Sequence, residues 1–274
     1  MPTLAEVTAA ADLLYPPGWA ADWDAVGLVC GDPDAEVRHV HFAVDPVDAT
    51  VTEALEVGAD LLFCHHPLLL RGVHGVPAGT PKGRIVHRLV RAGVGLFTAH
   101  TNADVANPGV SDALAARLGL TDVRPIDPAG LDGGRGYGRI GLLPVGEPLS
   151  TFAERAAGAL PATAAGLRVA GDPDRPVHAV AVAGGAGDDL LDAVADLRAD
   201  AYLTADLRHH PASERLAAGG PALLDASHWA TEQPWLADAA GRLRDALSGT
   251  VETTVSTLPT DPWTAHHPTG ANAP

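Results

Sequence analysis

The sequence has few cysteines, few aromatic residues and no long apolar run. Its two cysteines, Cys30 and Cys64, exclude a disulfide framework and predict free thiols in a reducing compartment. Charges or glycines interrupt the apolar residues throughout, and no stretch approaches the roughly 18 apolar residues of a membrane span. Residues 1–6 show neither the basic start nor the apolar core of a secretory signal. We therefore expect a cytoplasmic globular protein without a membrane partner.

Basic residues are also scarce. The chain has 18 Lys and Arg against 34 Asp and Glu, which gives a formal net charge of −16. Such a surface repels phosphate backbones, and no Lys/Arg cluster offsets it, so the composition disfavours nucleic-acid binding. Acidity suits a protein that attracts metal cations, but it is equally typical of proteins that only need solubility.

The first part of the chain shows the patterns of an α/β unit. Thr3 is placed to cap a helix over residues 3–14, which must end before Pro16. Apolar periodicity and turn residues then predict strands at 39–44, 59–64 and 94–99 and helices at 46–57, 83–91 and 110–118. We assign residues 1–125 to this unit.

A Pro/Gly-rich segment from Pro125 to Gly138 predicts a change of structural unit, because its turn residues disfavour both helix and strand. Beyond it, the order of elements repeats, with helices at 149–160 and 188–197 and strands at 177–183 and 201–204. We assign residues 126–258 to a second α/β unit, which could be interleaved with the first. Residues 259–274 lack periodicity and predict a largely disordered tail, with His266 and His267 solvated.

Three apolar strands each run into residues that can bind metal. The first leads to His65-His66-Pro67 and the second, over residues 96–99, to His100-Thr101-Asn102-Ala103-Asp104. Neutral imidazole suits zinc, iron, manganese, cobalt or nickel, and a carboxylate can complete the set. Taken alone, the histidines could equally be bonded to the backbone, and Asn and Asp could simply form a turn.

The third strand, near Leu223-Leu224, leads to His228 and Glu232. We expect a helix to begin near Thr231, with His228 just before it and Glu232 in its first turn, where a carboxylate also suits the helix dipole. Recurrence of the same pattern at three strand ends favours a metal site over three unrelated accidents.

With these motifs in place, the chain resembles the Nif-three-like dinuclear-metal family, whose members are often labelled GTP cyclohydrolase 1 type 2 homologue. The resemblance covers nearly the whole chain. Its segments are Asp24-Ala25-Val26-Gly27-Leu28, Cys64-His65-His66-Pro67-Leu68, His100 to Asp104, Gly138-Arg139-Ile140-Gly141, Gly184 to Gly187, Thr204 to His210, Ser227 to Glu232 and Thr260-Asp261-Pro262-Trp263.

The resemblance implies two divalent metal ions per chain, held by His65, His66, Asp104, His228 and Glu232, with Glu232 bridging the ions. Two ions about 3.5 to 4 Å apart would activate a bridging water for hydrolysis of a small-molecule substrate, such as a nucleotide or related heterocycle. His100, Asp206 and His210 match positions near the family's site, where they would shuttle protons or orient ligands. The family's fold has two α/β units with the site in the cleft between them, assembled as a homo-hexamer.

The chain departs from the family's pattern at three positions. Cys64 replaces a Thr, where it either fills a buried position or supplies a soft thiolate that alters metal preference. Ala186 and Ala205 replace a Ser and a Gly, so a role that depends on that Ser hydroxyl is lost. A non-catalytic alternative, a metallochaperone-like or regulatory ring, stays open because ligands for binding and for catalysis are the same residue types.

Overall fold

A computed structural model describes residues 1–127 and 133–267 of the 274-residue chain, which divide into two compact units. The first unit consists of Met1–Val110 and Trp235–Thr260, and the second of Ser111–Pro234 and the described residues from Asp261 onward. These limits differ from the predicted 1–125 and 126–258. The difference arises because helix α10 (Trp235–Ala246) and strand β11 (Glu252–Val255) return to the first unit, where β11 pairs with the strand that begins at His39.

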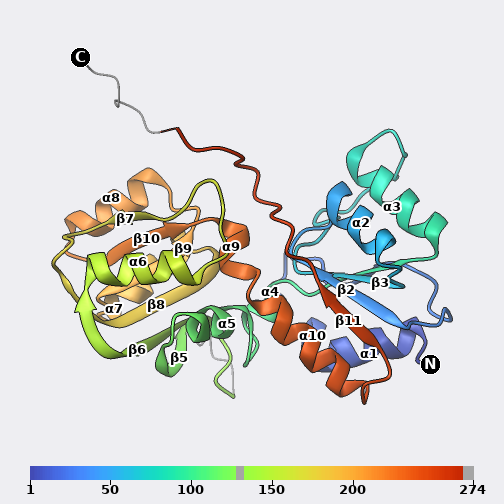
Figure 1. Ribbon diagram of the computed structural model, residues 1–274, viewed down its shortest axis with the longest axis horizontal. Coiled ribbons are helices and arrows are strands. Elements are labelled where there is room, and N and C mark those ends of the chain that lie inside the picture. Colours follow the sequence, from blue (N-terminus) through green and yellow to red (C-terminus); the bar gives the residue numbers. More distant parts are fainter. Residues whose placement is uncertain (128–132, 268–274) are drawn as a thin grey trace. The chain divides into compact units, whose positions relative to one another are not determined.

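The first unit has a five-stranded sheet in the order β1-β4-β3-β2-β11. Its first four strands in chain order are β1 (Gly27–Cys30), β2 (His39–Ala43), β3 (Leu61–Cys64) and β4 (Gly95–Thr98). Strands β2, β3, β4 and β11 are parallel, and only β1 runs antiparallel to its neighbour. Helices α2 (Asp48–Glu56) and α3 (Pro81–Ala92) cover one face, and α1 (Leu4–Leu14) and α10 cover the other (Figure 1). Because both faces are covered, every residue of β3 is buried.

Two features expected from the sequence are found in this unit. Thr3 caps α1 in a capping box with Glu6, as predicted. Cys64 is fully buried in an apolar cluster with Leu62 and Leu96, which agrees with the space-filling interpretation of this residue. Burial raises the pKa of the Cys64 thiol well above its usual value, so the thiolate is disfavoured.

The second unit has a six-stranded sheet in the order β5-β6-β8-β9-β10-β7. Its strands are β5 (Thr121–Asp127), β6 (Tyr137–Pro148), β7 (Arg168–Ala170), β8 (Pro176–Ala186), β9 (Ala201–Ala205) and β10 (Ala222–Ala226). Its helical elements are α5 (Val110–Arg117, beginning at the unit boundary), α6 (Leu149–Ala159), η2 (Asp188–Leu190), α7 (Leu191–Asp196), α8 (His209–Ala217) and α9 (His228–Glu232). Strands β8, β9 and β10 are parallel, so this unit too presents a run of strand ends at one edge. The predicted α/β class with two units is confirmed.

Two predictions of local structure need correction or qualification. Pro125 lies inside strand β5 rather than in a turn, because β5 is an edge strand and a proline costs no ladder hydrogen bond on its outer side. Residues 128–132 of the predicted boundary segment, and 268–274 of the predicted tail, lie outside the described residues. His266 and His267 are exposed, as predicted. Within the described ranges, no helix is long and apolar enough to cross a membrane.

Candidate metal centre

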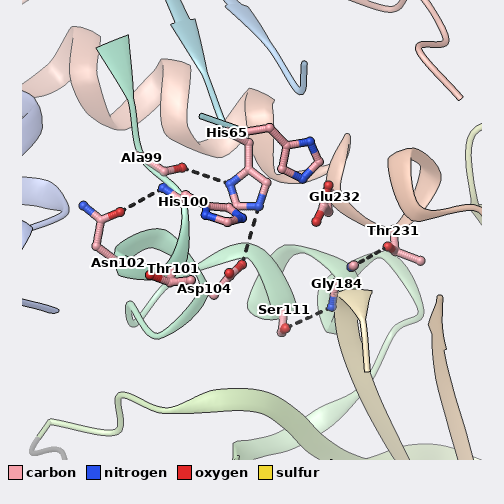
Figure 2. Close-up of polar contacts among 12 residues, drawn as sticks. His65, Ala99, His100, Thr101, Asn102, Asp104, Ser111, Gly184, Thr231 and Glu232 are labelled. Atoms are coloured by element: carbon pink, nitrogen blue, oxygen red, sulfur yellow. Dashed lines mark hydrogen bonds and ion pairs between the residues drawn. The ribbon is translucent and has the colours of Figure 1, made fainter. Parts of the chain in front are cut away.

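Strand β3 ends at Cys64 and places His65 in the interior of the first unit. The Nδ1 of this fully buried ring donates to the carbonyl of Ala99 at 2.9 Å. In a neutral imidazole that donates from Nδ1, the lone pair is on Nε2. This Nε2 lies 3.6 Å from Oδ1 of Asp104, the last residue of the short helix α4 (Thr101–Asp104) (Figure 2). The geometry directs a nitrogen donor and a carboxylate toward one point.

His66 is oriented in the same way, by a side chain from another strand end. Its Nδ1 lies 2.7 Å from Oδ1 of Asp45, which follows strand β2. A carboxylate oxygen accepts, so the neutral ring donates from Nδ1 and has its lone pair on Nε2. Asp45 is a functional residue that sequence reasoning missed, although its position two residues after a buried strand follows the same rule that singled out His65 and His66.

His100 is the residue before α4, and its ring is hydrogen-bonded to Asp24. Its Nδ1 lies 2.8 Å from Oδ1 of Asp24, whose other oxygen accepts from the backbone N–H of Thr101 at 3.0 Å and from its hydroxyl at 2.5 Å. Burial alone would raise the pKa of Asp24, but the hydrogen bonds from Thr101 and His100 outweigh it and lower that pKa. Burial, followed by repulsion from His65, lowers the pKa of His100 to about 4, so His100 is neutral at pH 7.

The three histidines of the first unit form one cluster. Each offers a ring nitrogen, and these nitrogens all lie within 4.8 Å of one another. The ring centroid of His65 lies 5.0 Å from that of His66 and 5.2 Å from that of His100. Exposed Trp23 lies beside this cluster, with its ring edge-on to His100 at 6.0 Å. Sequence reasoning expected His65 and His66 as ligands and His100 as a neighbour, and the structure brings all three together with Asp104.

The second unit carries a separate set of donors on α9. His228 and Glu232 are the first and last residues of this helix, and the Nε2 of His228 lies 3.0 Å from Oε1 of Glu232. The expected helix start near Thr231 is therefore wrong: the turn begins at His228, and the spacing of four residues puts both side chains on one face. Glu232 is 3% exposed, so its carboxylate is part of the interior.

Asp206 fixes the ring of His228. Its Oδ2 lies 2.7 Å from the Nδ1 of His228, and this hydrogen bond is the main reason why the pKa of Asp206 is lowered. Asp206 has a φ of +56°, a left-handed conformation that an Asp tolerates at some cost. Asp206 was expected near the site from the resemblance. In the structure it contacts His228 directly and has a strained backbone conformation.

A glycine loop supports Glu232. Gly185 has a φ of +68°, and a Cβ added there would lie 2.6 Å from Oε1 of Glu232. The loop is held by hydrogen bonds from Gly185 N–H to Thr231 at 2.9 Å and from Gly184 N–H to Ser111 at 3.2 Å (Figure 2). The positive φ and the crowding of the Glu232 and His228 side-chain ends favour glycine at Gly185, a role that the composition of the loop alone could not indicate.

His210 is placed differently from the other candidate residues. It lies exposed in the first turn of α8, and its ring contacts that of His209 at a centroid distance of 5.1 Å. The hydrogen bond to His228 comes from Asp206, which lies just before this helix. A shuttle role for His210 stays a prediction.

The donors of the two units share one chemical feature. In His65, His66, His100 and His228, Nδ1 is hydrogen-bonded to a carbonyl or carboxylate oxygen, so Nε2 is the ring nitrogen that could bind a metal ion. This is the arrangement by which proteins orient histidine ligands to metals. Together with the carboxylates of Asp104 and Glu232, it suits zinc, iron, manganese, cobalt or nickel. Both units thus carry histidine and carboxylate side chains that could bind a metal ion.

Comparison with known proteins gives the family. Residues 2–262 match the model of the Duf34/NIF3 (NGG1p interacting factor 3) family, and the chain belongs to this family. It is 54% identical over 271 residues to the Streptomyces coelicolor "GTP cyclohydrolase 1 type 2 homolog", covering 97% of this chain and 95% of that protein. It is also 40% identical to the Mycobacterium tuberculosis protein of the same description, in an alignment of 373 residues that covers 97% and 98% of the two chains.

Solved structures share the fold. A Bacillus cereus protein related to NIF3 matches with a TM-score of 0.87 at 23% identity, covering 96% of this chain and 98% of that one. A Staphylococcus aureus hypothetical protein matches with a TM-score of 0.86 at 25% identity, covering 97% and 100%. The two-unit α/β architecture is thus the family's fold, and the family recognised from the sequence motifs is confirmed.

Proposed function

We propose that this protein is a hydrolase that depends on two metal ions, which His65, His66, Asp104, His228 and Glu232 would hold. The observation that carries the proposal is the common orientation of the histidines, each tied through Nδ1 to an oxygen acceptor. Histidine ligands almost always have such a partner on their second nitrogen, so the repetition of this arrangement at rings that lie beside carboxylates supports a metal site. When bound, such ions lower the pKa of water and stabilise negative charge that develops on a substrate.

The remaining polar residues would then orient ligands and move protons. Asp45 and Asp206 hold the rings of His66 and His228. His100 is neutral at pH 7 and bonded through Nδ1 to Asp24, so its Nε2 can accept a proton and later return it. His210 is proposed as a second proton carrier on the resemblance alone.

The substrate class is taken from the relatives. Their description as GTP cyclohydrolase 1 type 2 homologues supports a nucleotide or related heterocycle as the small-molecule substrate. A cytoplasmic location, as expected from the sequence, and a homo-hexameric assembly, as implied by the family resemblance, complete the proposal. Size-exclusion chromatography with light scattering checks the assembly.

Metal analysis of purified protein tests the ligand set. We expect about two equivalents per chain in the parent protein and a large loss in Glu232→Gln, because the amide removes the negative charge of a proposed ligand. Glu214→Gln is the matched control, since Glu214 is exposed on α8 of the same unit. A parent with no metal, or a Glu232→Gln variant that keeps both ions, contradicts the proposed centre.

Turnover is tested separately with the metal-loaded protein. GTP, other nucleotides, phosphoesters and amides are each assayed with zinc, iron, manganese, cobalt and nickel. We expect hydrolysis of a nucleotide or heterocycle that Glu232→Gln abolishes and Glu214→Gln preserves. Two bound ions without turnover of any of these compounds would contradict the hydrolase and favour the non-catalytic metal-binding alternative.

A further inference from the structure

The stretch from Thr254 in β11 to Ser256 just after it is held to the rest of the first unit by hydroxyl side chains. Thr254 Oγ1 lies 2.7 Å from Nε2 of His39 and 2.8 Å from Nδ1 of His41. Two residues on, Ser256 donates from its hydroxyl to Glu53 at 2.5 Å and from its backbone N–H to the carbonyl of Phe42 at 2.8 Å. The course of the chain is therefore fixed at two points before it reaches Thr260.

Thr260, further along the chain, contacts the carboxylate of Asp45. Its hydroxyl donates to Oδ2 of Asp45, while Oδ1 of the same carboxylate accepts from Nδ1 of His66 at 2.7 Å. The two oxygens thus have different donors from parts of the chain that are 215 and 21 residues away from Asp45. The side chain of Asp45 is 25% exposed, so water can compete for its oxygens. The hydroxyl of Thr260 donates to Oδ2 from a fixed position. It therefore opposes rotation of the carboxylate and keeps Oδ1 directed toward His66.

We infer that Thr260 is a positioning residue that sets the orientation and tautomer of His66 through Asp45. With Oδ1 held toward it, the neutral ring of His66 donates from Nδ1 and keeps its lone pair on Nε2. Without the hydroxyl, the carboxylate rotates more freely and the ring loses its single preferred tautomer. The positioning itself concerns this unit alone. Its effect on metal affinity rests on the proposed function.

The test compares Thr260→Val, which removes the hydroxyl at nearly constant shape, with Thr260→Ser, which keeps it. In metal-free protein, long-range proton–nitrogen NMR reads the tautomer of His66, whose signals are assigned by their loss in His66→Gln. We expect one Nδ1–H tautomer in the parent and in Thr260→Ser, and a mixture in Thr260→Val. Asp45→Asn, which cannot accept at both atoms, should disturb His66 at least as much.

Cobalt titration followed by absorbance gives the second measurement. Loss of a ligand's direct partner typically lowers metal affinity by about 10- to 100-fold, which we expect for Asp45→Asn. Thr260 acts one contact further away, so Thr260→Val should lower the affinity by less than the loss of the direct partner, by about three- to tenfold. Thr260→Ser should match the parent.

The outcomes separate this inference from the proposed function. Unchanged His66 tautomer in Thr260→Val overturns the inference, as does a disturbance by Thr260→Ser equal to that by Thr260→Val. A parent protein that binds no cobalt overturns the proposed metal centre, and the NMR comparison in metal-free protein then still decides whether Thr260 positions His66.

Discussion

Replacement of Asp24 by Asn probes the most heavily bonded carboxylate of the first unit. The side chain of Asp24 has no exposed surface, and its two oxygens accept four hydrogen bonds. Oδ1 accepts from the N–H of Ala25 and from Nδ1 of His100, and Oδ2 accepts from the N–H and the hydroxyl of Thr101. An Asn of the same shape has one accepting oxygen, and its NH₂ group must face two of these donors.

The expected loss of stability depends on which of these four donors can rearrange to accept a hydrogen bond from the amide. The hydroxyl of Thr101 can rotate to accept, and the ring of His100 can change tautomer, but a backbone N–H can do neither. Whichever way the amide turns, either Ala25 or Thr101 is left with a buried N–H facing another donor. An unsatisfied buried group costs about 1–3 kcal/mol, and the lost charge-assisted bonds add to this. We therefore expect Asp24→Asn to lower the free energy of unfolding by about 2–4 kcal/mol.

Urea unfolding at pH 7, followed by tryptophan fluorescence and circular dichroism, measures this change. Asp22→Asn is the control, because Asp22 is exposed in the same loop and its replacement should alter the stability by no more than about 0.5 kcal/mol. The reasoning is refuted if Asp24→Asn is as stable as Asp22→Asn. The pKa of Asp24 is lowered in the native state, so its contribution is present above the unfolded value of about 3.9 and is lost as the pH falls through the lower native pKa. The difference in free energy of unfolding between the parent and Asp24→Asn should therefore shrink as the pH falls through this lowered pKa.

Three further predictions concern other parts of the chain. Gly185→Ala should displace the carboxylate of Glu232 and reduce the metal content of the purified protein, and retention of the parental content would refute the close approach at this loop. His41 is buried and its pKa is lowered, mainly by burial, so the unfolded chain takes up a proton first as the pH falls below about 6.5. Its neutral form therefore stabilises the fold above that pH, and the stability advantage of the parent over His41→Gln should decrease between pH 7.5 and 5; a constant difference would contradict this. Cys64 should resist a thiol reagent until the protein unfolds, whereas Cys30, which is only partly buried, should react in the native state, as timed colorimetric labelling can show. Equal native reaction rates would exclude the space-filling role of Cys64.

The elements of both units could largely be predicted from the sequence, because apolar periodicity and capping residues are local signals. The strand before His65 and the helix capped by Thr3 are examples. The division of the chain could not be predicted in the same way. Strand β11 has only four residues, the first three of which are polar, and its place beside β2 depends on a partner about 210 residues away.

The candidate site was predictable in part for the same reason. Strand ends identified His65, His66, Asp104, His228 and Glu232, since each lies next to an apolar run. Asp24 and Asp45, the carboxylates bonded to His100 and His66, were missed, because no local rule tells which distant Asp will meet a given His. Asp24 is 76 residues from His100, and only the folded chain brings them to 2.8 Å.

The first unit is built from two pieces of chain that flank the second unit. Residues 111–234 are made as one continuous stretch, whereas the sheet of the first unit is complete only when β11 has been added. During synthesis, His65 and His66 therefore leave the ribosome long before Thr260. Thr260 is the residue that donates to Asp45, which in turn accepts from His66. We expect residues 111–234 to fold in the nascent chain before β11 completes the sheet of the first unit.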